Sequence, residues 1–321
     1  MKFIGIDIAK DTFVAAYPVQ SGYQTKSYPN DNKGVKKFIS SFSSGEHHCV
    51  LEATGNYGTL LLYMLSEQEI AVSLVNPKQI KYFARMMMAV TKTDFVDAKL
   101  IALYGEKMQP PIYKMPTETI VLLKQKKVIL RQLKKQLTSL NNLKESFKVL
   151  PKVDKNSLRV LDKTAGFIEK QISEVETELS DIAKEVFGEQ IKSLTSIKGI
   201  GITLATSLII STGGFSQFEN SKQLSRYIGI CPTYQQSGTS INIKGSISRN
   251  GNSQLRSLLY IASWSAIRYN AACKETYKRL KAKGKPSKVA LIAVANKLVR
   301  QAFAICTAET TYVDGYVSKA C

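Results

Sequence analysis

The sequence has few of the residues that build disulfide frameworks or zinc sites. Only five of its 321 residues are cysteines, an odd number, and no two of them form a C-x-x-C pair. Histidine occurs only as the adjacent His47 and His48, which would point to opposite faces of a strand. These shortages argue against a disulfide scaffold and a histidine metal site, and they favour a reducing, cytoplasmic compartment.

Targeting segments and long apolar runs are also missing. The chain begins directly with a β-like run, Phe3 to Asp7, and shows no apolar stretch typical of a signal peptide. The apolar run Leu204 to Ile210 is too short to span a membrane and is interrupted by Thr206 and Ser207. We therefore expect no membrane partner.

Acidic residues are scarce relative to basic ones. The chain has 25 Asp and Glu against 45 Lys and Arg, so its formal net charge is +20. Such a surplus favours a polyanionic partner, most simply nucleic acid. A basic, solvated surface is the alternative, and lipid binding is disfavoured because no basic amphipathic anchor is evident.

Residues 1–115 have the pattern of a mixed α/β domain. Short apolar runs alternate with turn residues and helical segments, which predicts a mixed sheet flanked by helices. The expected strands are 3–8, 13–17, 23–28, 49–52 and 71–75. A helix with Asp94 and Asp97 near its start is expected at the end of this domain.

Four acids of this domain are candidates for one metal site. Asp7 and Glu52 lie on strands, and Asp94 and Asp97 share a helix face because they are three residues apart. If they meet at the carboxyl edge of the sheet, they could bind Mg²⁺ around a phosphodiester. In the alternative interpretation, Asp7 pairs with Lys10 or Lys92, Glu52 caps a turn, and the helix start is a solvated acidic face.

Residues 116–190 have coiled-coil spacing. Apolar residues recur at intervals of three and four along two segments separated near Pro151, which predicts a hairpin of two long helices. The first helix is rich in lysine, so we expect it to contact phosphate and to pair with another subunit. A hairpin that packs only within its own chain would have the same pattern.

Residues 191–321 are expected to be mostly helical. A turn containing Lys198, Gly199 and Gly201 resembles a helix-hairpin-helix, although a plain turn between helices fits equally well. A small, polar loop follows at 234–245 and contains Ser237. Its neighbourhood offers cations at Lys244, Arg249 and Arg256. A serine there could attack phosphorus, but on chemistry alone a turn residue is the simpler interpretation.

Together these motifs resemble the DEDD-type insertion-sequence transposases, the bridge-RNA-guided DNA recombinases. The matching segments are Ile4-Gly5-Ile6-Asp7, Ala9-Lys10, Glu52-Ala53-Thr54-Gly55, Lys92-Thr93-Asp94, Asp97-Ala98, Ile200-Gly201, Ser237-Gly238, Ser248-Arg249, Gly251, Leu255-Arg256 and Tyr260. The resemblance covers nearly the whole chain in the same order, and the set is specific although each motif alone is short.

This resemblance implies a ribonuclease-H-like, RuvC-like domain over 1–115, a coiled coil over 116–190 and a serine-bearing transposase domain over 191–321. Asp7, Glu52, Asp94 and Asp97 fall on the family's acidic tetrad, which implies Mg²⁺. Ser237 falls on its nucleophilic serine and would form a transient phosphoserine link. The residues before it, Tyr234 to Gln236, are less charged than the family pattern, so its contacts stay open and Ser240 is the rival nucleophile.

The resemblance further implies partners that composition does not reveal. These are donor and target DNA, a structured noncoding guide RNA, and a homodimer that pairs into a tetramer on DNA. Two other functions stay open at this point. One is a junction-resolving metal nuclease that uses water as its nucleophile, and the other is a nucleic-acid-binding scaffold without catalysis.

Overall fold

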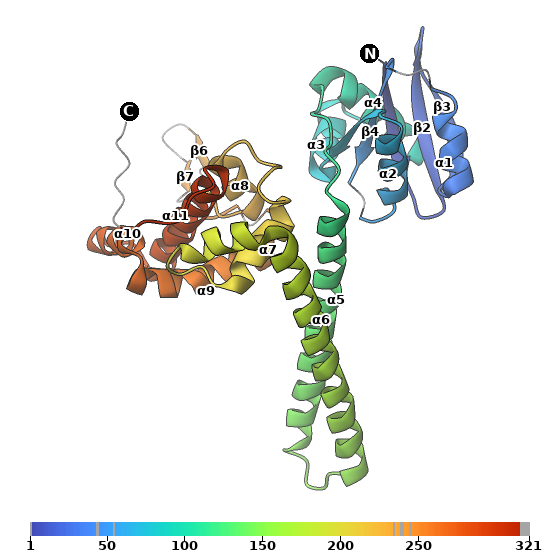
Figure 1. The fold of residues 1–321 in the computed structure, drawn as a ribbon. Coiled ribbons are helices and arrows are strands. Elements are labelled where there is room, and N and C mark those ends of the chain that lie inside the picture. The colour runs from blue at the N-terminus through green and yellow to red at the C-terminus, as the bar shows by residue number, and fades with distance from the viewer. Residues whose placement is uncertain are drawn as a thin grey trace. The chain divides into compact units, whose positions relative to one another are not determined.

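The computed structural model describes residues 2–42, 45–53, 55–233, 235–237, 241–243, 246–248 and 250–314, with the backbone alone at 235–237 and 241–243. The chain divides into two compact units, Met1–Met115 and Pro116–Cys321 (Figure 1). A further division of the second unit at residue 190 stays a prediction.

The first unit contains the mixed five-stranded sheet that its sequence predicts. The strands are β1 (Lys2–Ile8), β2 (Thr12–Val19), β3 (Gly22–Pro29), β4 (His47–Glu52) and β5 (Ala71–Val75). Their order in the sheet is β3-β2-β1-β4-β5. The strands β1, β4 and β5 run parallel, whereas β2 and β3 complete an antiparallel meander on one side.

Side chains alternate along each strand, so successive residues face the helices on opposite sides of the sheet. The helices of this unit are α1 (Asn32–Ile39), α2 (Thr59–Glu67), α3 (Pro77–Met86) and α4 (Asp94–Met108). On one face, Ile4 and Ile6 belong to the core formed with α1 and α2. On the other face, Val50 packs with Ile101 of α4. The two histidines follow the same alternation, since His48 stacks on Phe3 and His47 packs against Phe42.

A hairpin of two long helices begins the second unit, as the leucine spacing predicts. The helix α5 (Glu118–Phe147) lies beside α6 (Lys155–Ser196), and Figure 1 shows them side by side. Three ion pairs join them, namely Lys126 with Glu178, Lys134 with Glu176 and Lys144 with Asp162. These lysines therefore have carboxylate partners within the chain. The pairs lie at the surface of the hairpin, where ion pairs contribute little to stability.

The rest of the second unit is a helical bundle with one small hairpin. Its elements are α7 (Ile202–Thr212), α8 (Ser221–Ile228), β6 (Gln235–Ser237), β7 (Ile241–Ile243), α9 (Ser253–Tyr269), α10 (Ala271–Ala282) and α11 (Ser287–Thr307). A turn connects α6 to α7, and within it Gly199 has a φ of 107°. A Cβ there would lie 2.7 Å from the Cβ of Ala266 on α9, so this position requires glycine.

The helix α11 corrects one sequence-based expectation. Among the described residues it is the one helix long and apolar enough to cross a membrane, with a mean hydropathy of 1.6. The expectation that no apolar segment is long enough to span a membrane is therefore wrong, as judged by length and composition. However, Val294, Leu298 and Val299 are fully buried in the core of the second unit. We therefore assign α11 as a core helix of the bundle.

Candidate active site

The position of the candidate acids depends on how closely α4 approaches β1. A Cβ added to Gly5 would lie 2.1 Å from the backbone nitrogen of Ala102 and 2.2 Å from the carbonyl oxygen of Ala98. Further along the helix, Gly105 lies against Phe3 in the same way. The helix thus runs antiparallel to β1, and its first turn, with Asp94 and Asp97, lies toward Asp7.

Replacing Gly5 by alanine is expected to destabilise the first unit by about 1–3 kcal/mol, because the new methyl group overlaps helix backbone that cannot rotate away. Chemical denaturation followed by circular dichroism would measure the change. The matched control is Gly166→Ala, at a mid-helix position with open space around it. This substitution should raise the free energy of unfolding by about 0.5–1 kcal/mol. Unchanged stability in Gly5→Ala would contradict the close approach of α4 and β1.

Sheet register brings Asp7 and Glu52 to the same edge. The parallel pairing of β1 and β4 matches Ile6 with Leu51, so the next step along both strands places Asp7 beside Glu52. Both acids lie on the α4 face, because Gly5 and Val50, two residues earlier, face that helix. They are at the carboxyl ends of two parallel strands, which is where open α/β sheets form ligand sites.

The four acids are close enough to perturb one another. The pKa of Asp7 is raised to about 6, mainly by burial and in addition by the negative charges of Asp97, Asp94 and Glu52. Burial and the charge of Asp97 also raise the pKa of Glu52. Burial is the main cause of the raised pKa of Asp97, where Lys92 acts in the opposite direction and Asp94 adds to the increase. The structure therefore brings Asp7, Glu52, Asp94 and Asp97 together.

Mutual repulsion of this kind is what a bound cation relieves. Four carboxylates form the hard oxygen donor set that Mg²⁺ prefers, so the chemistry of the group fits that ion. As the side chains are placed, no three described His, Cys, Asp or Glu residues form a group that could hold a metal. Cation binding would thus require the carboxylates to lie closer together than they do here.

Lys92 was assigned only as a possible partner of Asp7. Its charge lowers the pKa of Glu52 and of Asp97 instead, from an exposed position one residue before the helix cap. The cap itself is Thr93, whose hydroxyl accepts a hydrogen bond from the amide of Val96 at 3.3 Å. The spacing of Lys92, Thr93 and Asp94 was the signal in the sequence that could have revealed this arrangement.

The serine predicted as nucleophile is the last residue of β6. Its backbone pairs with Ile241 of β7 in an antiparallel hairpin. The side chain of Ser237 lies outside the described part of the structure, as does its rival Ser240. The root of the hairpin is described, and there Pro232 forms a bridge with Ile247.

The four predicted nucleic-acid contacts have different surroundings. Lys198 is exposed, and its backbone carbonyl accepts a hydrogen bond from the side chain of Asn270 at 3.3 Å. Arg256 is half-buried and donates from Nη1 to the carbonyl oxygen of Ile228 at 2.9 Å, which shows that it supports the end of α8. Lys244 and Arg249 lie outside the described residues.

Comparisons with known proteins cover both units. Residues 4–148 match a model of DEDD transposases of the IS110 group, and residues 191–278 match the model described as "Transposase IS116/IS110/IS902 family". The pilin gene-inverting protein of Moraxella bovis is 32% identical over 94% of this chain and 95% of its own length. A transposase for insertion sequence element IS1111A of Coxiella burnetii is 24% identical over 98% of this chain and 92% of its own length.

Proposed function

Because this chain belongs to the IS116/IS110/IS902 family of DEDD transposases and is thus a DNA recombinase, we propose that it cleaves and exchanges DNA strands through Ser237 and a Mg²⁺ site at Asp7, Glu52, Asp94 and Asp97. The observation that carries the proposal is the convergence of these four acids at one sheet edge. A protein that only binds nucleic acid has no need of such a costly cluster.

The acids would hold the cation, and the serine would supply the bond-forming atom. Bound Mg²⁺ would neutralise the carboxylates and stabilise the charge that develops on the scissile phosphate. The Ser237 hydroxyl loses its proton and attacks phosphorus, forming an O–P bond while the DNA oxygen leaves and takes up a proton. A second DNA hydroxyl then displaces the serine, so strands are exchanged rather than hydrolysed.

Strand exchange accounts for the relatives better than simple cutting does. The Moraxella protein is named for gene inversion, which requires that cut ends be rejoined in a new order. A covalent serine link conserves the energy of the phosphodiester for that second step. A water nucleophile would release the ends, so we favour the serine over the junction-resolving nuclease.

The remaining partners of the proposed reaction are nucleic acids and further subunits. A net charge of +20 is suited to holding donor DNA, target DNA and a structured guide RNA at once. The acids and Ser237 belong to different compact units. We therefore propose a homodimer, paired into a tetramer on DNA, in which one subunit supplies the acids and another the serine.

Removing divalent metal is expected to stop DNA cleavage while leaving DNA binding intact. Excess EDTA should reduce cleavage to background, because the four carboxylates then repel the phosphate, and added Mg²⁺ should restore it. A cleavage gel and a binding assay on the same samples make the comparison. Cleavage that persists in excess chelator would remove the acidic site from the reaction.

A further inference from the structure

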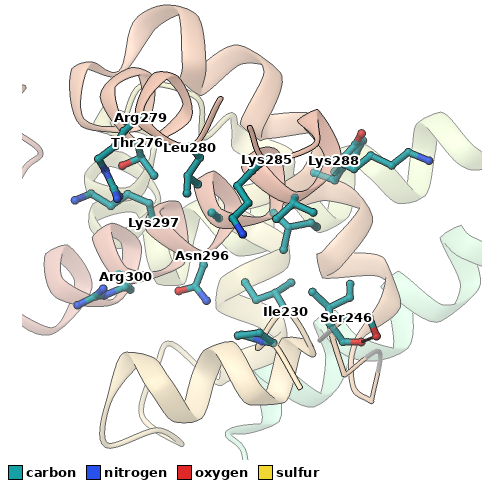
Figure 2. Close-up of a pocket in the computed structure, with 16 residues that line it drawn as sticks. Ile230, Ser246, Thr276, Arg279, Leu280, Lys285, Lys288, Asn296, Lys297 and Arg300 are labelled. Atoms are coloured by element: carbon teal, nitrogen blue, oxygen red, sulfur yellow. Dashed lines mark hydrogen bonds between the residues drawn. The ribbon is translucent and has the colours of Figure 1, made fainter. Parts of the chain in front are cut away.

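A large pocket in the second unit lies outside the residues assigned above. Its volume is about 950 Å³, and it is lined from α9, α10, α11 and the root of the β6–β7 hairpin (Figure 2). Pockets for small organic ligands measure roughly 300–1,000 Å³, so this one has room for a nucleotide and a flanking phosphate.

The pocket is strongly cationic. Among the described residues, the five charged ones that line it are all basic, and no Asp or Glu lines it. They are Arg279, Lys285, Lys288, Lys297 and Arg300. Figure 2 shows the Lys285 amino group turned toward the middle of the pocket and the Lys288 amino group turned outward. Unlike the lysines of α5 that pair with α6, these cations surround an open space, which suits a ligand with several negative charges.

The interior of the pocket is apolar, which phosphate binding alone does not require. Ile230, Leu280, Val289 and Ile292 contribute aliphatic surface, and Tyr260 contributes an aromatic ring. A nucleobase offers a planar face to such surfaces, and stacking on an aromatic ring stabilises an unpaired base. Cations around an apolar interior thus match the two chemical parts of an unstacked nucleotide.

The root of the hairpin that carries Ser237 contributes to the lining of this pocket. Pro232 and Ile247, which bridge at the hairpin root, are both lining residues. The amide of Thr233 donates to the carbonyl oxygen of Ser246 at 2.7 Å, which fixes the root beside the pocket. Ser237 lies five positions after Pro232, a span of at most about 17 Å, or roughly five nucleotide steps of 3.4 Å.

We propose that the pocket receives one unstacked nucleotide of the DNA strand that Ser237 attacks. The base lies against Tyr260 and Ile292, and the neighbouring phosphates contact Arg279 and Arg300. This assignment rests on the proposed function, because the strand at the hairpin is identified as DNA through that reaction. Holding one displaced nucleotide would fix the register of the strand relative to the serine.

Binding measurements with the full-length protein test this pocket without any cleavage step. The probes are single-stranded oligothymidylate and a polymer of equal length whose sugars are abasic. The wild type should bind the intact strand roughly 5- to 100-fold more tightly, the range expected for stacking one base. Tyr260→Ala should lose most of that preference while keeping its affinity for the abasic strand.

An exposed arginine provides a second variant that is less sensitive to folding. Arg300→Gln should lower the affinity for both the intact and the abasic strand. It should also lower the slope of log affinity against log salt by about one. The matched control is Arg268→Gln on α9, an exposed arginine outside the pocket, which should change binding less than twofold. Equal losses in the two arginine variants would overturn the assignment of the pocket cations.

The remaining outcomes separate this proposal from the proposed function. Equal wild-type affinity for intact and abasic strands would overturn the base pocket, even if a serine–DNA adduct forms. A base preference without any adduct would support the pocket and refute the role of Ser237. Oligouridylate measured alongside should bind more weakly than oligothymidylate, and tighter binding of the RNA strand would overturn the assignment to DNA.

Discussion

Replacing Ser237 by alanine is expected to abolish the covalent protein–DNA adduct and to slow strand exchange by at least about 10³-fold. The effect is this large because the serine oxygen forms the bond that the second step must break, and alanine has no atom to replace it. Purified protein would be incubated with substrate DNA and Mg²⁺, and the adduct resolved on a denaturing gel. DNA affinity should stay within about twofold of the wild type, since phosphate contacts supply most of the binding.

The neighbouring serine gives this experiment its control. Ser240→Ala removes the same hydroxyl three residues away, and it should keep both the adduct and the exchange reaction. If adduct formation is lost in Ser240→Ala and kept in Ser237→Ala, the nucleophile has been assigned to the wrong residue. If Ser237→Ala still cuts DNA at the wild-type rate and neither protein forms an adduct, water is the nucleophile and the protein is a metal nuclease.

The sequence predicted on which elements the four acids lie, because that placement depends largely on local rules. Alternation along β1 and β4 decides which face Asp7 and Glu52 occupy, and helical spacing keeps Asp94 and Asp97 together. Parallel pairing of strands then brings their carboxyl ends to one edge. These steps follow from local patterns, whereas the approach of α4 to β1, which brings Asp94 and Asp97 near Asp7, does not.

Features that depend on contacts between distant segments were not predictable in this way. The close approach at Gly5 depends on Ala98 and Ala102, which are more than ninety residues further along the chain. Arg256 was expected to contact nucleic acid, yet its hydrogen bond to the Ile228 carbonyl could be found only in the fold. The cationic pocket likewise joins side chains from several elements, and no single stretch of sequence contains its pattern.

Replacing Asp7 by asparagine is expected to make the metal-free protein more stable and the reaction slower by at least about 10³-fold. Asparagine carries no charge, so it avoids both the desolvation and the repulsion from Asp97, Asp94 and Glu52 that raise the pKa of Asp7. Because Asp7 is partly exposed, solvent screening reduces this gain to the order of 1 kcal/mol at neutral pH. For this variant, denaturant unfolding should show higher stability, and a strand-exchange assay should show a lower rate.

The pH dependence of stability identifies the cause of that gain. Below about pH 4, Asp7 is protonated in both the folded and the unfolded wild type, so its ionisation costs nothing. As the pH rises through about 6, the folded state must ionise the buried group, and the contribution of Asp7 to stability is lost. Asp7→Asn should show a smaller decline, to which Glu52 and Asp97 still contribute, whereas Asp11→Asn, an exposed control in the same unit, should show the full decline.

Added Mg²⁺ should make the wild type more stable than Asp7→Asn, the reverse of the order expected without metal. A cation that binds only the folded state raises stability by RT ln(1 + [Mg²⁺]/Kd), so the wild type should gain melting temperature with added Mg²⁺. Asp7→Asn should gain less, because it offers one carboxylate fewer to the ion. An equal Mg²⁺ response in both proteins would mean that the raised pKa of Asp7 reflects burial alone, and that the acids do not share a metal.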